Sequence, residues 1–82
     1  MIQFSHAIAD PEGLHARPIA AIAATLAPLS SAVTIRVGER SSEARDLMGM
    51  LGLEARGGST IEVTIEGPDE EQAAEALRAV LP

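Results

Sequence analysis

The stretch Gly13-Leu14-His15-Ala16-Arg17-Pro18 is the most specific motif in the sequence, and the expected elements are located relative to it. Glycine permits a turn, and an apolar, alanine-rich segment then runs to Leu26. Proline costs little in the first turn of a helix, because its missing N–H would have no partner there. We therefore expect a helix with His15 as its N-cap and Ala16 as its first residue, ended by Pro28.

His15 would combine a nucleophilic ring with an anion-binding position. The first N–H groups of a helix lack partners and the dipole adds positive charge, so such a terminus binds anions. Ala16, Arg17 and Pro18 form this terminus, Pro18 by position only, and Arg17 adds a cation suited to phosphate oxygens. Neutral imidazole is nucleophilic near neutral pH. The pattern predicts a histidine that carries a phosphoryl group on either ring nitrogen. The alternative is a helix-capping His15 beside a solvated Arg17.

Alternation of apolar and polar residues predicts the strands. A tight turn at a glycine links two of them, and the polar strand that follows it suits a sheet edge. The predicted strands are Ile2–Ala9, Ala32–Val37, Arg40–Glu43 and Thr60–Glu66, with the turn at Gly38-Glu39.

Two further helices are predicted from capping residues. Asp46 caps a short helix that reaches Leu53, and Asp69 with Gln72 forms a capping-box-like start of a helix ending near Pro82. The core-facing residues expected in the first and last helices are Ile19, Ile22, Leu26 and Leu29, and Ala73, Ala76, Leu77, Val80 and Leu81. The order is β-α-β-β-α-β-α, an α+β open-faced β-sandwich with helices on one face of an antiparallel sheet.

Composition excludes several classes of protein. The chain has 82 residues, no cysteine and a single aromatic residue, which predicts one domain over residues 1–82 with an aliphatic core. A net charge of −6 argues against nucleic acid and anionic membranes as partners. No apolar run approaches the roughly 20 residues of a membrane span, and the first residues lack a signal-peptide pattern. We expect a cytoplasmic protein without membrane insertion, cofactor or metal.

The stretch around His15 resembles the phosphorylation site of HPr, the histidine-containing phosphocarrier of the bacterial phosphoenolpyruvate-dependent phosphotransferase system. The similarity continues without gaps through Leu47-Met48-Gly49 to Gly67 and the last helix. It implies sheet order 1-4-2-3 and attack through Nδ1 of His15. It also implies phosphorylated enzyme I as donor, an enzyme IIA-type acceptor, and a carrier regenerated in each cycle rather than an enzyme. We expect a monomer. Sugar uptake, nitrogen-related regulation and dihydroxyacetone phosphorylation are the branches open to it.

The resemblance also implies a docking surface beside His15. We expect Ala20, Leu47 and Met48 to be exposed contacts, and Met50 and Leu51 to lie mainly in the core. Methionine is flexible and suits a surface that accepts several partners. The alternative for the second helix is simple core packing.

Three residues need separate interpretation. Glu12 stands where many relatives have an uncharged polar residue. It is a solvated loop residue, or it repels an incoming phosphoryl group, or it orients the His15 ring by hydrogen bonding. Asp46 replaces the serine that a kinase phosphorylates in many Gram-positive relatives, and it is a helix cap or a partial mimic of that charge. His6 falls on an apolar strand face, where we expect a structural histidine with a satisfied ring nitrogen.

Two other classes of protein are compatible with this element order. A regulatory binding module of similar α+β fold would not be phosphorylated and would not need His15. A small metal-dependent enzyme would use both histidines with nearby carboxylates.

Overall fold

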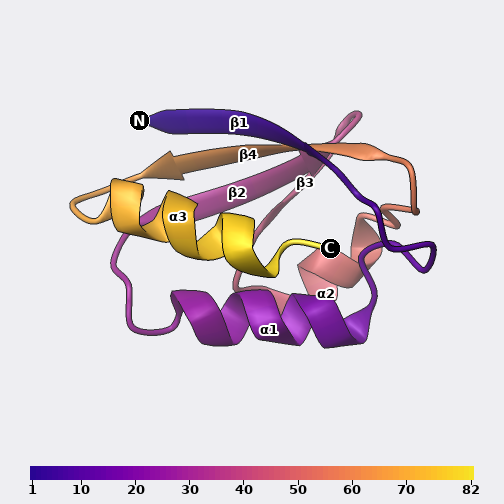
Figure 1. The fold of residues 1–82 in the computed structure, drawn as a ribbon, viewed down its shortest axis with the longest axis horizontal. Helices are drawn as coiled ribbons and strands as arrows, with labels where there is room; N and C mark the ends of the chain where they lie inside the picture. Colours follow the sequence, from indigo (N-terminus) through magenta and orange to yellow (C-terminus); the bar gives the residue numbers. More distant parts are fainter.

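The computed structural model describes residues 1–82 and has the predicted order β-α-β-β-α-β-α. The elements are β1 (Ile2–Ala7), α1 (Ala16–Leu26), β2 (Ala32–Val37), β3 (Arg40–Glu43), α2 (Leu47–Gly52), β4 (Thr60–Glu66) and α3 (Glu70–Val80). The strands form one antiparallel sheet in the order β1-β4-β2-β3, and the three helices lie on one face of it (Figure 1). The predicted open-faced sandwich and sheet order are confirmed.

The core is aliphatic, as the composition predicts. Strand alternation buries Ile61, Val63 and Ile65 of the central strand β4 under the helices. Val63 is the partner of Phe4 on one side and of Ile35 on the other. No aromatic residue is among the 17 core residues, and Phe4 packs against them only partly buried. None of the helices is long and apolar enough to cross a membrane.

Strand β1 ends at Ala7, two residues before the predicted end. The N–H of Ile8 still bonds to Ser59, the next position in the β1–β4 register, and the chain turns away from β4 at Ala9, whose N–H bonds to Pro82. His6 lies on the half-buried side of β1, but its Nε2 atom is buried without a hydrogen-bond partner. The predicted satisfied ring nitrogen is therefore wrong, because this side of β1 faces an apolar core.

Helix α3 does not begin with the predicted capping box. Asp69 occupies the N-cap position but makes no side-chain bond to the helix. Its carboxylate instead accepts hydrogen bonds from the backbone N–H groups of Ser30 and Ser31 and from the Ser31 hydroxyl. The fully buried residues of α3 are Ala73, Ala74 and Leu77, whereas Ala76, Val80 and Leu81 are only partly buried.

Helix α2 confirms the predicted cap and corrects one core assignment. The carboxylate of Asp46 accepts a hydrogen bond from the N–H of Gly49 at 3.1 Å. Met50 is completely buried, as predicted, but Leu51 is 37% exposed. Successive helical residues point about 100° apart, so in this short helix Met50 fills the core position and Leu51 turns toward the surface.

The far end of α1 is fixed by an arginine from the segment before α2. The Arg45 guanidinium donates to the carbonyls of Leu26 and Leu29 at 3.1 and 3.0 Å, and a third bond goes to Glu43. The Leu26 carbonyl also accepts the N–H of Leu29, so Arg45 adds a second bond there and caps the Leu29 carbonyl beyond the end of the helix. The Arg45 bonds hold α1 in place relative to β3 and α2.

Candidate functional site

The β1–α1 connection, the first turn of α1 and helix α2 lie at the same end of the molecule (Figure 1). The connection is held by Gly13, which is buried and has φ +69°. A Cβ atom at this position would collide with the carbonyl oxygen of Ala55. The adjacent N–H of Leu14 donates to that same oxygen at 2.8 Å. Glycine is thus required for the close approach of the chain to Ala55, which brings His15 to the N-terminus of α1.

His15 is the N-cap of α1 and Ala16 is its first residue, as predicted. The His15 backbone is extended, and its side chain makes no capping bond to the helix. The side chain is 33% exposed. The ring is therefore accessible from solvent and is not occupied as a cap.

The first turn of α1 provides donors that the protein does not use. No group in the chain accepts a hydrogen bond from the backbone N–H of Ala16 or Arg17. Arg17 is exposed and forms no ion pair, and Pro18 is half-buried. These residues and His15 line an open hollow of about 700 Å³. A nucleophilic ring, two free amides and a guanidinium thus share one hollow, which is the arrangement predicted for a phosphoryl carrier.

Two carboxylates face the His15 ring from the preceding loop. Asp10 Oδ2 lies 3.4 Å from Nε2 and forms a hydrogen bond with it, and Glu12 Oε2 lies 3.5 Å from the same nitrogen. The Glu12 backbone N–H donates to Asp10 Oδ1 at 2.9 Å. That bond, with the His15 ring as a further cause, lowers the pKa of Asp10 below its usual value. Asp10 is therefore ionised at neutral pH and can only accept.

The sequence pattern points to Glu12 as a neighbour of His15 but not to Asp10. The Asp10-Pro11-Glu12-Gly13 segment is recognisable as a turn, and an aspartate that starts such a turn often bonds the backbone two residues later. That signal could have indicated a fixed carboxylate near His15. It is the turn, together with the left-handed Gly13, that brings Asp10 back to a ring five residues further along.

Asp10, Glu12 and His15 also offer one possible metal-ligand atom each, all within 4.8 Å of one another. No other histidine, cysteine or acidic residue joins this group, and His6 is not part of it. A metal enzyme that uses both histidines is therefore not supported by the geometry. Exposed acidic groups of this kind are common beside a histidine without a metal role.

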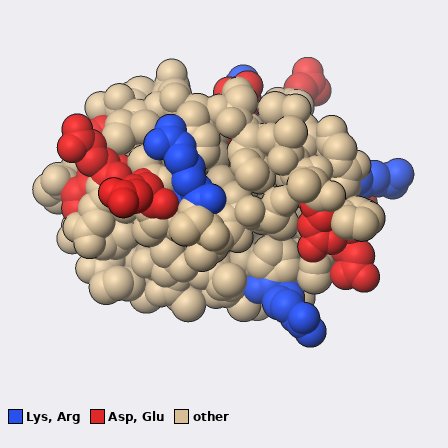
Figure 2. Space-filling model, in the orientation of Figure 1, with Lys and Arg blue, Asp and Glu red and all other residues tan.

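The residues expected to dock partners lie on the surface next to this hollow. Ala20 is exposed on α1, and Leu47 and Met48 are 46% and 73% exposed on α2, which packs against α1. The exposed Leu51 extends this apolar area. Figure 2 shows acidic side chains gathered toward the two ends of the helix-covered face, with mostly uncharged atoms between them. The surface formed by Ala20, Leu47, Met48 and Leu51 is thus apolar rather than basic.

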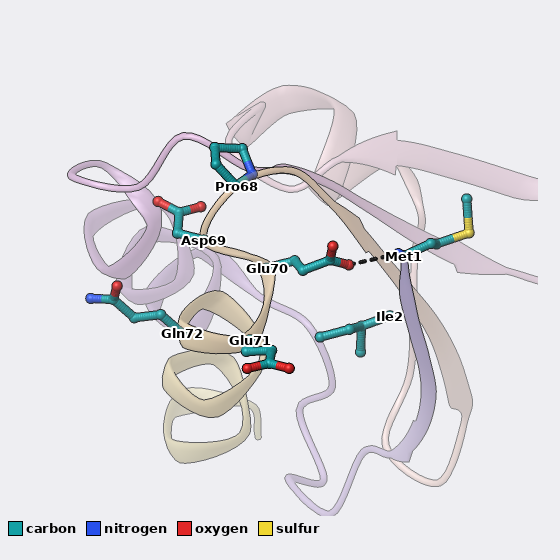
Figure 3. A pocket seen from close by; sticks show the side chains of 7 residues that line it. All are labelled: Met1, Ile2, Pro68, Asp69, Glu70, Glu71 and Gln72. Atoms are coloured by element: carbon teal, nitrogen blue, oxygen red, sulfur yellow. Dashed lines mark ion pairs between the residues drawn. The ribbon is translucent and has the colours of Figure 1, made fainter.

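A second hollow, of about 560 Å³, lies between the start of β1 and the start of α3 (Figure 3). Two of its three acidic groups are already engaged: Glu70 pairs with the Met1 ammonium at 2.8 Å, and Asp69 bonds the α1–β2 connection. The residues that line it include no histidine, serine, threonine or arginine. It does not compete with the His15 hollow as a site of chemistry.

Comparison with known proteins agrees with this geometry. The family described as "PTS HPr component phosphorylation site" matches residues 2–82. The chain belongs to the HPr family. It is similar to the phosphocarrier protein HPr of Lysinibacillus sphaericus, with 38% identity over 74 residues, which is 90% of this chain and 84% of that protein.

Other HPr-like proteins extend the comparison. The crystal structure of HPr-C-His from Thermoanaerobacter tengcongensis superposes with a TM-score of 0.92 at 31% identity, covering 99% of this chain and 91% of that one. A multiphosphoryl transfer protein of Xanthomonas campestris pv. campestris is 38% identical over 79 residues, 96% of this chain but 9% of that protein. The chain has the HPr fold and is a phosphocarrier protein of the phosphotransferase-system type rather than a catalytic enzyme.

Proposed function

We propose that His15 accepts a phosphoryl group from phosphorylated enzyme I and passes it to an enzyme IIA-type acceptor, in sugar uptake or nitrogen-related regulation. The observation that carries this proposal is the accessible His15 ring beside the unpaired N–H groups of Ala16 and Arg17 and the free Arg17 guanidinium. The function follows from the role of HPr proteins as carriers.

In the proposed reaction, the lone pair of His15 Nδ1 attacks the phosphorus atom while the donor's own bond to phosphorus breaks. The free amides and the guanidinium bind the three phosphoryl oxygens through charge-assisted hydrogen bonds. Pro18 contributes only by starting the helix. Nδ1 is proposed because Nε2 faces Asp10, whereas Nδ1 has no hydrogen-bond partner.

Docking is proposed to use the apolar surface of Ala20, Leu47 and Met48. Because none of these side chains is charged, the surface favours partners that present a complementary apolar patch. Asp46 caps α2 at the place where relatives carry a phosphorylated serine, so we propose that this chain lacks that switch and keeps its cap permanently. We further propose that residues 1–82 act as one domain, as a monomer in the cytoplasm.

The test is incubation of the purified protein with phosphoenolpyruvate and enzyme I. An acid-labile mass gain of about 80 Da, one phosphoryl group, is expected on the peptide that contains His15. His15→Ala should abolish the gain, and His6→Ala, which removes the other histidine, should keep it. No gain in the unmodified protein, with function retained in His15→Ala, would favour a regulatory binding module.

A further inference from the structure

We propose that Asp10 is a positioning residue that holds the proton of the neutral His15 ring on Nε2 and thereby leaves Nδ1 free to react. This inference rests on the proposed function, in which Nδ1 of His15 receives the phosphoryl group. It assigns a role to a residue that the sequence pattern does not single out.

The two oxygens of the Asp10 carboxylate have separate tasks. Oδ1 accepts the N–H of Glu12 at 2.9 Å, and the backbone oxygen of Asp10 accepts the N–H of Gly13 at the same distance. The first bond fixes the side chain and the second fixes the turn, so that Oδ2 is left facing His15 Nε2 at 3.4 Å. An ionised carboxylate has no proton to donate, so the hydrogen of this bond must come from Nε2.

A neutral imidazole has a single N–H group. When the proton is on Nε2, the lone pair is on Nδ1, which is the nitrogen without a partner. The carboxylate of a Ser-His-Asp triad selects a histidine tautomer by the same logic from the opposite ring nitrogen.

The contact between Asp10 and Nε2 acts both when His15 receives the phosphoryl group and when it passes the group on. A bond forms between Nδ1 and phosphorus as the donor's bond to phosphorus breaks, and the Nε2 proton stays in place. The phosphorylated ring is then an imidazolium, whose positive charge lies beside the Asp10 carboxylate. In the next transfer, the bond from Nδ1 to phosphorus breaks and the ring leaves as neutral imidazole. No proton has to be gained or lost in either step.

Glu12 differs from Asp10 although both approach the same nitrogen. Its side chain is 74% exposed, its oxygen is 3.5 Å away, and it forms no hydrogen bond with the ring. Its main effect is a negative charge that opposes the incoming phosphoryl group. Glu12→Gln and Asp10→Asn therefore remove the same charge near the same atom, but only the second change alters a hydrogen bond.

The test compares Asp10→Asn, Asp10→Ala and Glu12→Gln. In Asp10→Asn, the amide oxygen keeps the bond to the Glu12 N–H, so an NH₂ group replaces the oxygen that faces Nε2. An NH₂ group only donates, which favours a lone pair on Nε2 and moves the proton to Nδ1. Asp10→Ala removes the side-chain bonds to the Glu12 N–H and to Nε2, and it loosens the turn. The tautomer is then set by the intrinsic preference of the imidazole ring.

Two readouts separate positioning from folding. Nitrogen-15 NMR of the His15 ring at about pH 8.5, where an ordinary imidazole is neutral, reports the tautomer. Single-turnover transfer from phosphorylated enzyme I reports the rate. We expect the Nε2–H form in the wild type and in Glu12→Gln, and a shift toward Nδ1–H in Asp10→Asn. Transfer to Asp10→Asn should be about tenfold slower, the size expected for one hydrogen bond to a charged group.

The order of the variants decides the outcome. Positioning predicts that Asp10→Asn is slower than Asp10→Ala and that Glu12→Gln is at least as fast as the wild type. The role of Asp10 would be overturned if the tautomer were unchanged in Asp10→Asn. It would also be overturned if Asp10→Asn transferred as fast as the wild type while Asp10→Ala was the slowest variant. Either result would leave the proposed function intact. Phosphorylation of His15→Ala by enzyme I would instead overturn the proposed function.

Discussion

The carboxylate of Asp69 accepts hydrogen bonds from both the backbone N–H and the hydroxyl of Ser31, 38 residues earlier in the chain. A third bond comes from the N–H of Ser30 at 2.8 Å. Ser31 is 1% exposed, so this contact joins the start of α3 to the buried end of the α1–β2 connection. One half-buried acid thus ties the β4–α3 connection to the α1–β2 connection.

Asp69 should make the protein less stable in acid. Its bonds to Ser31 and Ser30 lower the pKa of Asp69 below the ordinary value of 3.8. Because the folded-state pKa is lowered, the contribution is complete above the ordinary value and is lost as the pH falls through the folded-state pKa. Urea unfolding between about pH 5 and pH 2 should show a steeper loss of stability in the wild type than in Asp69→Asn. Parallel curves for the two proteins would contradict this role.

Arg45 should contribute to stability through the end of α1. Arg45→Met keeps much of the alkyl chain but removes the bonds to Leu26 and Leu29, which leaves two carbonyls without these partners. We expect a loss of about 1–2 kcal/mol in the free energy of unfolding, measured by urea denaturation. Arg36→Met is the matched control, because Arg36 is exposed and makes no hydrogen bond or ion pair, and it should change stability by less than about 0.5 kcal/mol. Equal losses in both variants would exclude a specific role for Arg45.

Gly13→Ala should disturb the site as well as the fold. The left-handed backbone and the contact with the Ala55 carbonyl both oppose a side chain there, so we expect a loss of about 2 kcal/mol or more. Thermal unfolding measures the loss, and phosphorylation should slow because His15 is displaced. Gly52→Ala is the control, since a Cβ there meets nothing and a helical alanine should stabilise by about 0.5–1 kcal/mol. A Gly13→Ala protein with wild-type stability and rate would refute the requirement for glycine.

The parts of the fold that sequence predicted are those specified by local signals. The start of α1 at His15, the Asp46 cap and the turn at Gly38 each depend on residues a few positions apart, and all three are confirmed. The sheet order required the resemblance to a known family, because alternation alone does not say which strands pair.

The errors arise where a distant segment competes for the same group. Asp69 has a local capping position available, but the N–H groups near Ser31 take its carboxylate instead. Leu51 is as apolar as Met50, and only the orientation of α2 on the sheet decides which is buried. The turn that starts at Asp10 has a local signal, but the contact of Gly13 with Ala55, which helps to bring Asp10 to the His15 ring, has none.

The apolar surface on α2 should matter for partners but not for the ring itself. Met48→Gln should slow transfer from enzyme I about fivefold, because a 73% exposed apolar contact is replaced by a polar one. Its reaction with phosphoramidate, a small phosphoryl donor that needs no docking, should stay unchanged. Thr34→Gln on the uncovered face of the sheet is the control, and it should leave both rates unchanged. If Met48→Gln slowed transfer from both donors, the effect would lie in the fold rather than in docking.

The central claim is that one ring nitrogen of His15 carries the phosphoryl group. The most direct measurement is phosphorus-31 and nitrogen-15 NMR of the histidine-labelled protein after reaction with phosphoenolpyruvate and enzyme I. We predict a single phosphoryl group on Nδ1 of His15, with the His6 resonances unchanged. A phosphoryl group on Nε2, on His6 or on a residue other than histidine would contradict the account.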